Sequence, residues 1–364
     1  MAYTTIDDPS VYFQTLLYTG NGGSQTMTND GNSDLQPDFL WIKQRSGTEN
    51  HYLGNSSIAN KFLNSDRTDS ESTNISGKEL TYNSDGFAFA GSDSTWNGSS
   101  STYVAWQWKA NGGTTTTNDA SSTGVGNTDS VYQANTTAGF SIVTWTGPSG
   151  SDARTMAHGL GGTPELIIYK NRDESVAWYV GTSAITFNFN TDYLQLNSNI
   201  AKATDAGGTV FVSAPTSTVI GSSSSAASGK ENIKYVAYCF RSIQGYSKIG
   251  SYTGNGNADG PFVYLGFKPA WVMVKRTNTT GAWEIYDSAR NGNDSNPIND
   301  RLRANDNAAE NTDDTSDYVS DFLSNGWKIR TNSGNWNTSG HTYIYMAFAE
   351  HPFVSSEGVP VTAR

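Results

Sequence analysis

The side chains that most often carry catalysis are few in this chain, and their spacing matches no known site. The four histidines show no metal-ligand spacing with one another; they are His51, His158, His341 and His351. The single cysteine, Cys239, lies in an apolar run typical of a buried strand, which favours a core residue over a nucleophile. We therefore predict no catalytic residue, no bound metal and no cofactor, and we expect a protein that is not an enzyme.

Carboxylates are more numerous, and hydrolysis of a glycosidic bond would need two of them across that bond. The nearest candidates, Glu284 and Asp287, are three residues apart, which places them on opposite faces of a strand. The acidic segment 313–317 offers oxygen ligands for Ca²⁺, but its spacing matches no calcium loop, so a solvated loop is the preferred interpretation. Polysaccharide hydrolysis is thus kept only as an alternative function.

A binding site is easier to motivate than a catalytic one. Two Trp-Asn pairs, Trp96-Asn97 and Trp336-Asn337, stand in polar loops before a closing strand. An exposed indole offers an apolar face to a sugar ring, and the amide both donates and accepts hydrogen bonds. We name these four residues as candidate glycan-binding residues. The alternative, which the usual burial of tryptophan favours, is that each indole closes its own domain as a lid.

The composition indicates what kind of fold positions these residues. The chain has 364 residues, 37 of them glycine, and 12% are aromatic, a mixture that favours short strands joined by turns. The net charge of −11 repels phosphate backbones and anionic membrane surfaces. No stretch approaches the roughly 20 apolar residues of a membrane helix. Nucleic acid and membranes are therefore not expected partners.

Three short blocks recur in the same order along the chain. An apolar strand ending in Thr-Gly comes first, a run from proline to lysine second, and a Tyr-aliphatic-Ala-aromatic strand third. The copies of the first block are 16–20, 143–147 and 249–254; of the second, 37–43, 164–170 and 269–275; and of the third, 103–106, 235–238 and 345–348. Conserved order with similar spacing indicates internal repetition of one unit of about a hundred residues.

We therefore predict an all-β chain of three tandem β-sandwich domains of jelly-roll type. The first spans 1–110, the second 131–241 and the third 242–364. The domains are expected as beads, with a flexible linker rich in Gly, Thr and Asn at 111–130 between the first and the second. The second and third domains are separated only by 241–245, so we expect them to pack rigidly against each other. Each Pro-to-Lys block is a continuous apolar run, which predicts a central strand buried on both faces.

These blocks resemble a domain of structural proteins from tailed phages of marine bacteria, including cyanophages. The resemblance is sharpest in the third domain and looser in the other two. The segments that carry it are 251–256, 260–263, 267–275, 285–290, 322–327 and 343–350. The family is similar in pattern to concanavalin-like lectin sandwiches, and it implies no catalytic residue. It implies a place on the exterior of a virion.

From this resemblance we expect a non-enzymatic surface protein of a phage particle, either a head knob or decoration or a tail-fibre appendage. Its expected partners are other capsid or tail proteins, with many copies on each particle, and host surface glycans are a second expected contact. Fibre-shaft repeats are missing from the sequence, which favours a globular appendage. Two alternatives remain: a phage-borne polysaccharide depolymerase, and a capsid decoration that binds nothing outside the particle.

Overall fold

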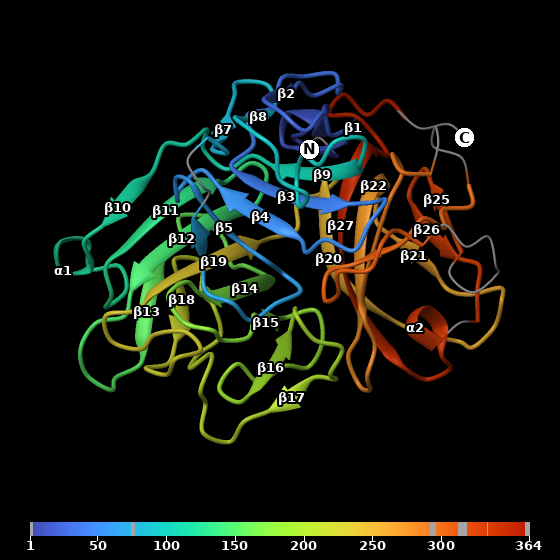
Figure 1. The fold of residues 1–364 in the computed structure, drawn as a ribbon. Coiled ribbons are helices and arrows are strands. Elements are labelled where there is room, and N and C mark those ends of the chain that lie inside the picture. Colours follow the sequence, from blue (N-terminus) through green and yellow to red (C-terminus); the bar gives the residue numbers. More distant parts are fainter. Residues whose placement is uncertain (1–2, 74–76, 292–295, 312–318, 333, 361–364) are drawn as a thin grey trace.

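The computed structural model describes residues 3–73, 77–291, 296–311, 319–332 and 334–360 (Figure 1). Almost all regular structure is strand, and the named strands pair antiparallel in three large sheets and three small ones. The helices are single turns: η1 (Pro9–Val11), α1 (Ala120–Thr123) and α2 (Gly334–Asn337). This confirms the prediction of an all-β fold with several sandwiches. We call the large sheets inner and the small sheets outer.

Three runs of strands follow one another, and each run forms one repeat. Repeat 1 contains β1 Phe13–Thr19, β2 Gln25–Met27, β3 Phe39–Gln44, β4 Tyr52–Asn55, β5 Lys61–Leu63, β6 Ser72–Thr73, β7 Leu80–Tyr82, β8 Phe87–Phe89 and β9 Thr102–Trp108. Repeat 2 contains β10 Thr116–Asn118, β11 Ser130–Asn135, β12 Phe140–Thr146, β13 Arg154–Ala157, β14 Leu166–Asn171, β15 Tyr179–Thr182, β16 Asp192–Gln195, β17 Ala203–Thr204, β18 Val219–Ser222 and β19 Lys234–Phe240. Repeat 3 contains β20 Ser247–Thr253, β21 Phe262–Tyr264, β22 Phe267–Arg276, β23 Trp283–Asp287, β24 Leu302–Arg303, β25 Ser320–Leu323, β26 Gly326–Ile329 and β27 Thr342–Pro352.

The inner sheets share one strand order. It is β1-β9-β3-β4-β5-β6 in repeat 1 and β20-β27-β22-β23-β24 in repeat 3. Repeat 2 has β12-β19-β14-β15-β16-β17 and adds β11 and β10 outside β12, which extends its sheet at one end of the molecule (Figure 1). The outer sheets are β2-β8-β7, β13-β18 and β21-β26-β25. The recurrence seen in the sequence therefore corresponds to a recurring topology.

The Pro-to-Lys blocks form the middle strands β3, β14 and β22. β3 and β14 are buried along their whole length, as is β22 from Trp271 to Lys275. The lysine that ends each block is called its terminal lysine. The three terminal lysines occupy matching places opposite β9, β19 and β27; the pairs are Lys43–Val104, Lys170–Val236 and Lys275–Ile344. The prediction of central strands buried on both faces is confirmed.

The third block of repeat 3 is displaced by two residues from the position that the sequence comparison assigned to it. Stacked cross-strand aromatic pairs mark the same register in all repeats; they are Tyr18–Tyr103, Trp145–Tyr235 and Tyr252–Tyr343. The segment equivalent to 235–238 is therefore 343–346, and not 345–348. The alternation of strand faces has a period of two, so a shift of two residues leaves the apolar pattern unchanged and hides the error.

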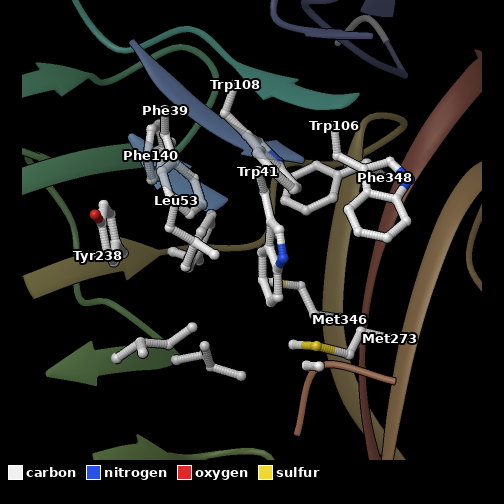
Figure 2. Close-up of a cluster of buried hydrophobic side chains, with 14 of the residues drawn as sticks. Phe39, Trp41, Leu53, Trp106, Trp108, Phe140, Tyr238, Met273, Met346 and Phe348 are labelled. Atoms are coloured by element: carbon white, nitrogen blue, oxygen red, sulfur yellow. The ribbon is translucent and has the colours of Figure 1, made fainter. Parts of the chain in front are cut away.

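One face of each inner sheet packs into a central core that all three repeats share, and the other face packs on its own outer sheet. Figure 2 shows rings from every repeat meeting in this core. The side chains of this core include Trp41 and Trp108 of repeat 1, Phe140 and Tyr238 of repeat 2, and Met273 and Phe348 of repeat 3. The repeats thus bury a common interior, which differs from the expected string of separate beads.

The junctions between repeats close into a ring. Eight residues after each terminal lysine stands an aromatic side chain whose ring nitrogen bonds to a backbone carbonyl of another repeat. The bonds are His51 Nε2 to Arg303 O (2.8 Å), Trp178 Nε1 to Asn64 O (2.8 Å) and Trp283 Nε1 to Gln195 O (2.8 Å). Repeat 1 thus contacts repeat 3, repeat 2 contacts repeat 1, and repeat 3 contacts repeat 2.

The segment 111–130, predicted to be a flexible linker, is folded: its start is bonded to repeat 1, and β10 pairs with β11 of repeat 2. It contains β10 and α1, and the amides of Gly112 and Gly113 donate to the carboxylate of Asp38 at 2.8 and 2.7 Å. Both glycines have positive φ, 59° and 79°, a conformation that favours glycine. The polar composition of the segment suggested a flexible linker. The structure shows instead that the buried carboxylate of Asp38 holds its first residues by hydrogen bonds.

Candidate functional site

The four residues predicted to contact glycans are all buried. Trp96 packs inside the sandwich of repeat 1, and Trp336 packs inside that of repeat 3, where its Nε1 donates to the Tyr286 hydroxyl at 3.0 Å. Asn97 and Asn337 are also fully buried. Neither indole offers a face to a sugar, which corrects the prediction. The structure agrees with the alternative interpretation, in which each indole folds back and closes its own sandwich as a lid.

The two asparagines explain why the Trp-Asn pair recurs. Asn97 Oδ1 accepts from the Asn21 amide at 3.0 Å, and Asn337 Oδ1 accepts from the Asn255 amide at 2.7 Å. Each bond holds the loop after the first strand of its repeat against the lid. The recurrence of this motif therefore reflects how repeats 1 and 3 fold, and the carboxamides that could have met a sugar are occupied.

Two of the four histidines, His51 and His158, and the cysteine are buried. Burial lowers the pKa of His51 to about 3 and that of His158 to about 4, and it raises the pKa of Cys239 to about 12. Within the described residues, no three or more His, Cys, Asp or Glu side chains are grouped so that they could hold a metal ion. The acidic segment 313–317 lies outside the described residues.

The two carboxylates considered for hydrolysis face opposite sides of β23 and are each held by arginine. Asp287 accepts from Arg290 Nε at 2.6 Å and from Trp106 Nε1 at 2.9 Å, so it joins repeats 1 and 3. Glu284 accepts from Arg303 Nε at 3.3 Å and is fully buried. Both carboxylates are therefore used in buried ion pairs and share no space that a substrate could enter.

The three terminal lysines are the most unusual ionisable groups of the molecule. Each is fully buried and donates to two backbone carbonyls, and those of Lys170 and Lys275 include Thr68 O (2.9 Å) and Asn199 O (3.2 Å) of the preceding repeat. Burial lowers the pKa to about 8 for Lys43 and to about 7 for the other two. A neutral amine has two N–H groups, which two carbonyls satisfy. The amines of Lys170 and Lys275 hold junctions together, whereas that of Lys43 bonds within repeat 1.

An open groove, by contrast, lies where repeats 2 and 3 meet. Its volume is about 800 Å³, and its floor is β20 with Lys248 and Gly250. Its lining also includes Tyr264 of β21 and Glu165 of repeat 2. The Tyr264 ring is half exposed, and Lys248 Nζ lies 5.3 Å from its centre. The groove therefore combines an aromatic face, a cation and a carboxylate at the surface.

In the lining of this groove, one cross-strand pair has its large and small residues in the reverse order from repeats 1 and 2. The equivalent cross-strand pairs are Leu16–Ala105, Val143–Ala237 and Gly250–Tyr345. A β-carbon at Gly250 would lie 2.5 Å from the Tyr345 hydroxyl oxygen, so the tyrosine takes the space of the missing side chain. Sequence reasoning missed this exchange because the two-residue shift in the third block concealed which residues face each other.

The Tyr345 hydroxyl is the buried polar group that points at the groove. Only 4% of Tyr345 is exposed, burial raises its pKa to about 12, and the residue lines the groove floor. Among the described residues its hydroxyl has no hydrogen-bond partner. A hydroxyl in the groove lining that has no protein partner can donate to or accept from a ligand atom in the groove.

Comparison with known proteins places this architecture in a family. No helix in the described part of the chain is long and apolar enough to cross a membrane. No curated protein and no solved structure matches the chain. One protein family does match, over residues 8–352, a range that runs from the start of repeat 1 to the end of β27. Because this single match covers all three repeats, the chain belongs to that family, which is described as a domain of unknown function (DUF7483).

Proposed function

We propose that the chain is a non-enzymatic structural protein on the exterior of a phage particle, as a head knob or decoration or as a tail-fibre appendage. The proposal starts from the resemblance of the third repeat to structural proteins of tailed phages. Two of the six segments that carry it, 267–275 and 343–350, lie in the paired strands β22 and β27 of the inner sheet of repeat 3. Other capsid or tail proteins are the proposed partners, with many copies on each particle.

The observation that carries the non-enzymatic part is the use made of the ionisable side chains. Asp287, Arg290 and Glu310 form a buried chain of ion pairs, and Glu310 continues it to Arg45 of repeat 1 at 2.7 Å. The buried lysines bond to backbone carbonyls. Groups that an enzyme would direct at a substrate instead hold three sandwiches in one body, which is the requirement of an architectural protein.

Immunogold labelling tests the location. Antibodies raised against the purified chain would be applied to intact particles of a phage that encodes it. We expect gold on the outside of the particles, on heads for a knob or decoration and on tails for a fibre appendage. Particles that contain the chain by mass spectrometry but bind no gold until they are disrupted would contradict an exterior location.

Contact with host surface glycans is the second part of the proposal, and burial of Trp96 and Trp336 leaves it without assigned residues. Many weak contacts on one particle would sum to firm attachment. A glycan array probed with the chain displayed in many copies tests this. Binding that rises with display density supports the contact, and no binding at any density leaves only the architectural role.

The depolymerase alternative predicts a different result. Incubation of the purified chain with envelope polysaccharide of the host would release new reducing ends if the protein were a hydrolase. We expect none, because Glu284 and Asp287 are held by arginines on opposite faces of β23. Release that survives Glu284→Gln and Asp287→Asn would point to other residues and would contradict the non-enzymatic proposal.

A further inference from the structure

Repeat 3 carries two exposed aromatic rings beside the groove. The residues of β21 are exposed, buried and exposed in turn, so Phe262 and Tyr264 point outward from one face of the outer sheet, and we call them the aromatic strip. Phe262 is 44% and Tyr264 is 51% exposed, and among the described residues only Val359 joins them as a large exposed apolar side chain. Because covering apolar surface is favourable, two exposed rings on one strand indicate a contact surface.

Repeat 1 builds the same part of its sandwich without aromatic rings. In repeat 3 a β-carbon at Gly326 would lie 2.1 Å from Val263 O. In repeat 1 a β-carbon at Gly86 would lie 2.0 Å from Met27 O, which makes Met27 the equivalent of Val263. The two neighbours of this methionine are exposed threonines, Thr26 and Thr28. The aromatic strip is therefore not needed to fold a sandwich of this kind, which points to a role in binding.

The Tyr264 ring is held in position at the groove. Lys248 Nζ donates to Tyr264 O at 2.7 Å and lies 5.3 Å from the centre of the ring. The hydroxyl oxygens of Tyr264 and Tyr3 lie 3.5 Å apart, and the Tyr3 hydroxyl donates to Gly266 O at 2.8 Å. A side chain that is ordered before binding loses less conformational entropy when a ligand covers it.

Polar groups of the groove lining are available to a ligand. The Tyr345 hydroxyl has no protein partner among the described residues. Glu165 Oε2 accepts from the Ser242 amide at 3.3 Å, and Glu165 Oε1 has no partner in the described part of the chain. The lining also contains Ser183 and Ser251. Hydroxyls both donate and accept, and the carboxylate oxygen accepts, so this lining suits a ligand rich in hydroxyl groups.

We propose that the groove and the aromatic strip bind a segment of a neutral oligosaccharide. A pyranose ring with equatorial hydroxyls presents axial C–H groups on its faces, and these groups pack on the electron-rich face of an aromatic ring. Its hydroxyls can bond to the polar groups of the lining. The assignment rests on the host-glycan part of the proposed function, and it gives that contact the residues that Trp96 and Trp336 do not supply.

The charges of the molecule favour a neutral sugar over an acidic one. The charged residues of the groove lining are Lys248 and Glu165, so one cation is balanced by one carboxylate. The net charge of −11 repels polyanions such as acidic polysaccharides. The ligand is therefore a chain of neutral hexose units, with one ring stacked on Tyr264 in the groove and a further ring on Phe262 outside it.

Affinity electrophoresis of the full chain tests the proposal. Native gels contain increasing concentrations of hydroxyethylcellulose, mannan or dextran, which are neutral, or of alginate, which is anionic, and the retardation of the protein gives a dissociation constant. We expect at least one neutral polymer to retard the chain and alginate to have no effect. Retardation by alginate alone contradicts the assignment to a neutral sugar. Retardation by none of the polymers removes both this site and the host-glycan contact, whereas the exterior location keeps its own test by immunogold labelling.

Substitutions in the groove locate the binding. Tyr264→Ala should weaken the affinity for the retarding polymer about tenfold, because it removes the ring on which a sugar stacks. Tyr345→Phe keeps the aromatic ring and should weaken the affinity about fivefold, because it removes one hydrogen-bonding hydroxyl. Phe262→Ala should weaken it about threefold, because only the sugar ring outside the groove loses its contact.

Val359→Ala is the matched control, because it shortens an exposed apolar side chain that does not line the groove. We expect it to leave the affinity unchanged, and we expect every variant to keep the circular dichroism spectrum of the unmodified chain. Equal retardation of the unmodified chain and of folded Tyr264→Ala and Tyr345→Phe variants would place the sugar elsewhere on the molecule. That result overturns this site and leaves the host-glycan contact standing.

Discussion

At the scale of single residues, equivalent positions in the repeats do similar work with different chemistry. Eight residues after the terminal lysine, repeats 2 and 3 have tryptophan and repeat 1 has His51. Trp41 Nε1 donates to His51 Nδ1 at 2.8 Å, which leaves the proton of the neutral ring on Nε2, where it bonds to Arg303 O. The histidine thus replaces the indole only in its neutral form.

Acid should therefore weaken the junction between repeats 1 and 3. The folded pKa of His51 is about 3 and the unfolded value is about 6.5, so the unfolded chain binds a proton first as the pH falls. The contribution of the neutral ring to stability is lost between pH 6.5 and 3. His51→Gln, which can keep both hydrogen bonds without titrating, should flatten the fall in unfolding free energy between pH 6 and 4 by up to ~1 kcal/mol per pH unit. Urea unfolding measures this, and His341→Gln is the surface control.

The buried lysines predict that stability also rises with pH, but in mild alkali. Their folded pKa values of about 7 to 8 lie below the ordinary 10.5, so above pH 7 the unfolded chain holds protons that the folded chain has lost. The unfolding free energy should rise from pH 7 to 9.5, by up to ~1 kcal/mol per pH unit for each lysine. Lys170→Met should reduce the slope, whereas Lys234→Met at the surface should not. A slope unchanged by Lys170→Met would contradict the assignment.

At the scale of elements, one carboxylate determines how the chain passes from repeat 1 to repeat 2. Asp38, in front of β3, is fully buried and accepts from the amides of Ala110, Gly112 and Gly113 and from the Ser56 hydroxyl. Hydrogen bonds to a charged group are stronger than those between neutral groups. The end of β9 and the beginning of the segment 111–130 are therefore fixed from a single point.

Asp38→Ala should release that segment. Several buried amides would lose their acceptor at once, so we expect a loss of ~3 kcal/mol in unfolding free energy. Amide hydrogen exchange at 110–114 should accelerate more than in β3, because the change removes the acceptors of the segment itself. Asp34→Ala, at an exposed position nearby, is the matched control. Unchanged exchange in the Asp38 variant would show that other contacts hold the segment.

At the scale of the whole molecule, the shared core makes the repeats interdependent. Trp108 at the end of β9 packs on Phe39 of its own repeat, on Phe240 of repeat 2 and on Trp271 and Phe348 of repeat 3. Removal of any repeat would expose the faces of the other two inner sheets. The ring of contacts at the junctions adds bonds between residues as far apart as His51 and Arg303.

We expect unfolding in one cooperative transition. Trp108→Ala should lower the unfolding free energy of the entire chain by ~4 kcal/mol, the usual cost of removing a large buried aromatic side chain. Phe262→Ala, where the ring is exposed, should change it by less than ~0.5 kcal/mol. Differential scanning calorimetry measures both. Three separate transitions, with only one of them lowered by Trp108→Ala, would show that the repeats fold independently.

The candidate groove illustrates where inference from the sequence stopped. The alternating apolar pattern located β20 and β27, and it could not fix their register, because a slip of two residues preserves which face is apolar. The pairing of Gly250 with Tyr345 was therefore invisible, and with it the hydroxyl in the groove floor. The Trp-Asn motifs were visible but ambiguous, since a tryptophan in a polar loop can point out or fold back.

The sequence by itself determined the all-β character, the threefold recurrence and the central strands, because apolar blocks of strand length between turn residues are local information. The tertiary structure alone decided that the three sheets close around one core and that Trp96 and Trp336 are lids. Each of these depends on which faces of distant strands meet, and strand pairing and burial between segments hundreds of residues apart are not encoded in any local pattern.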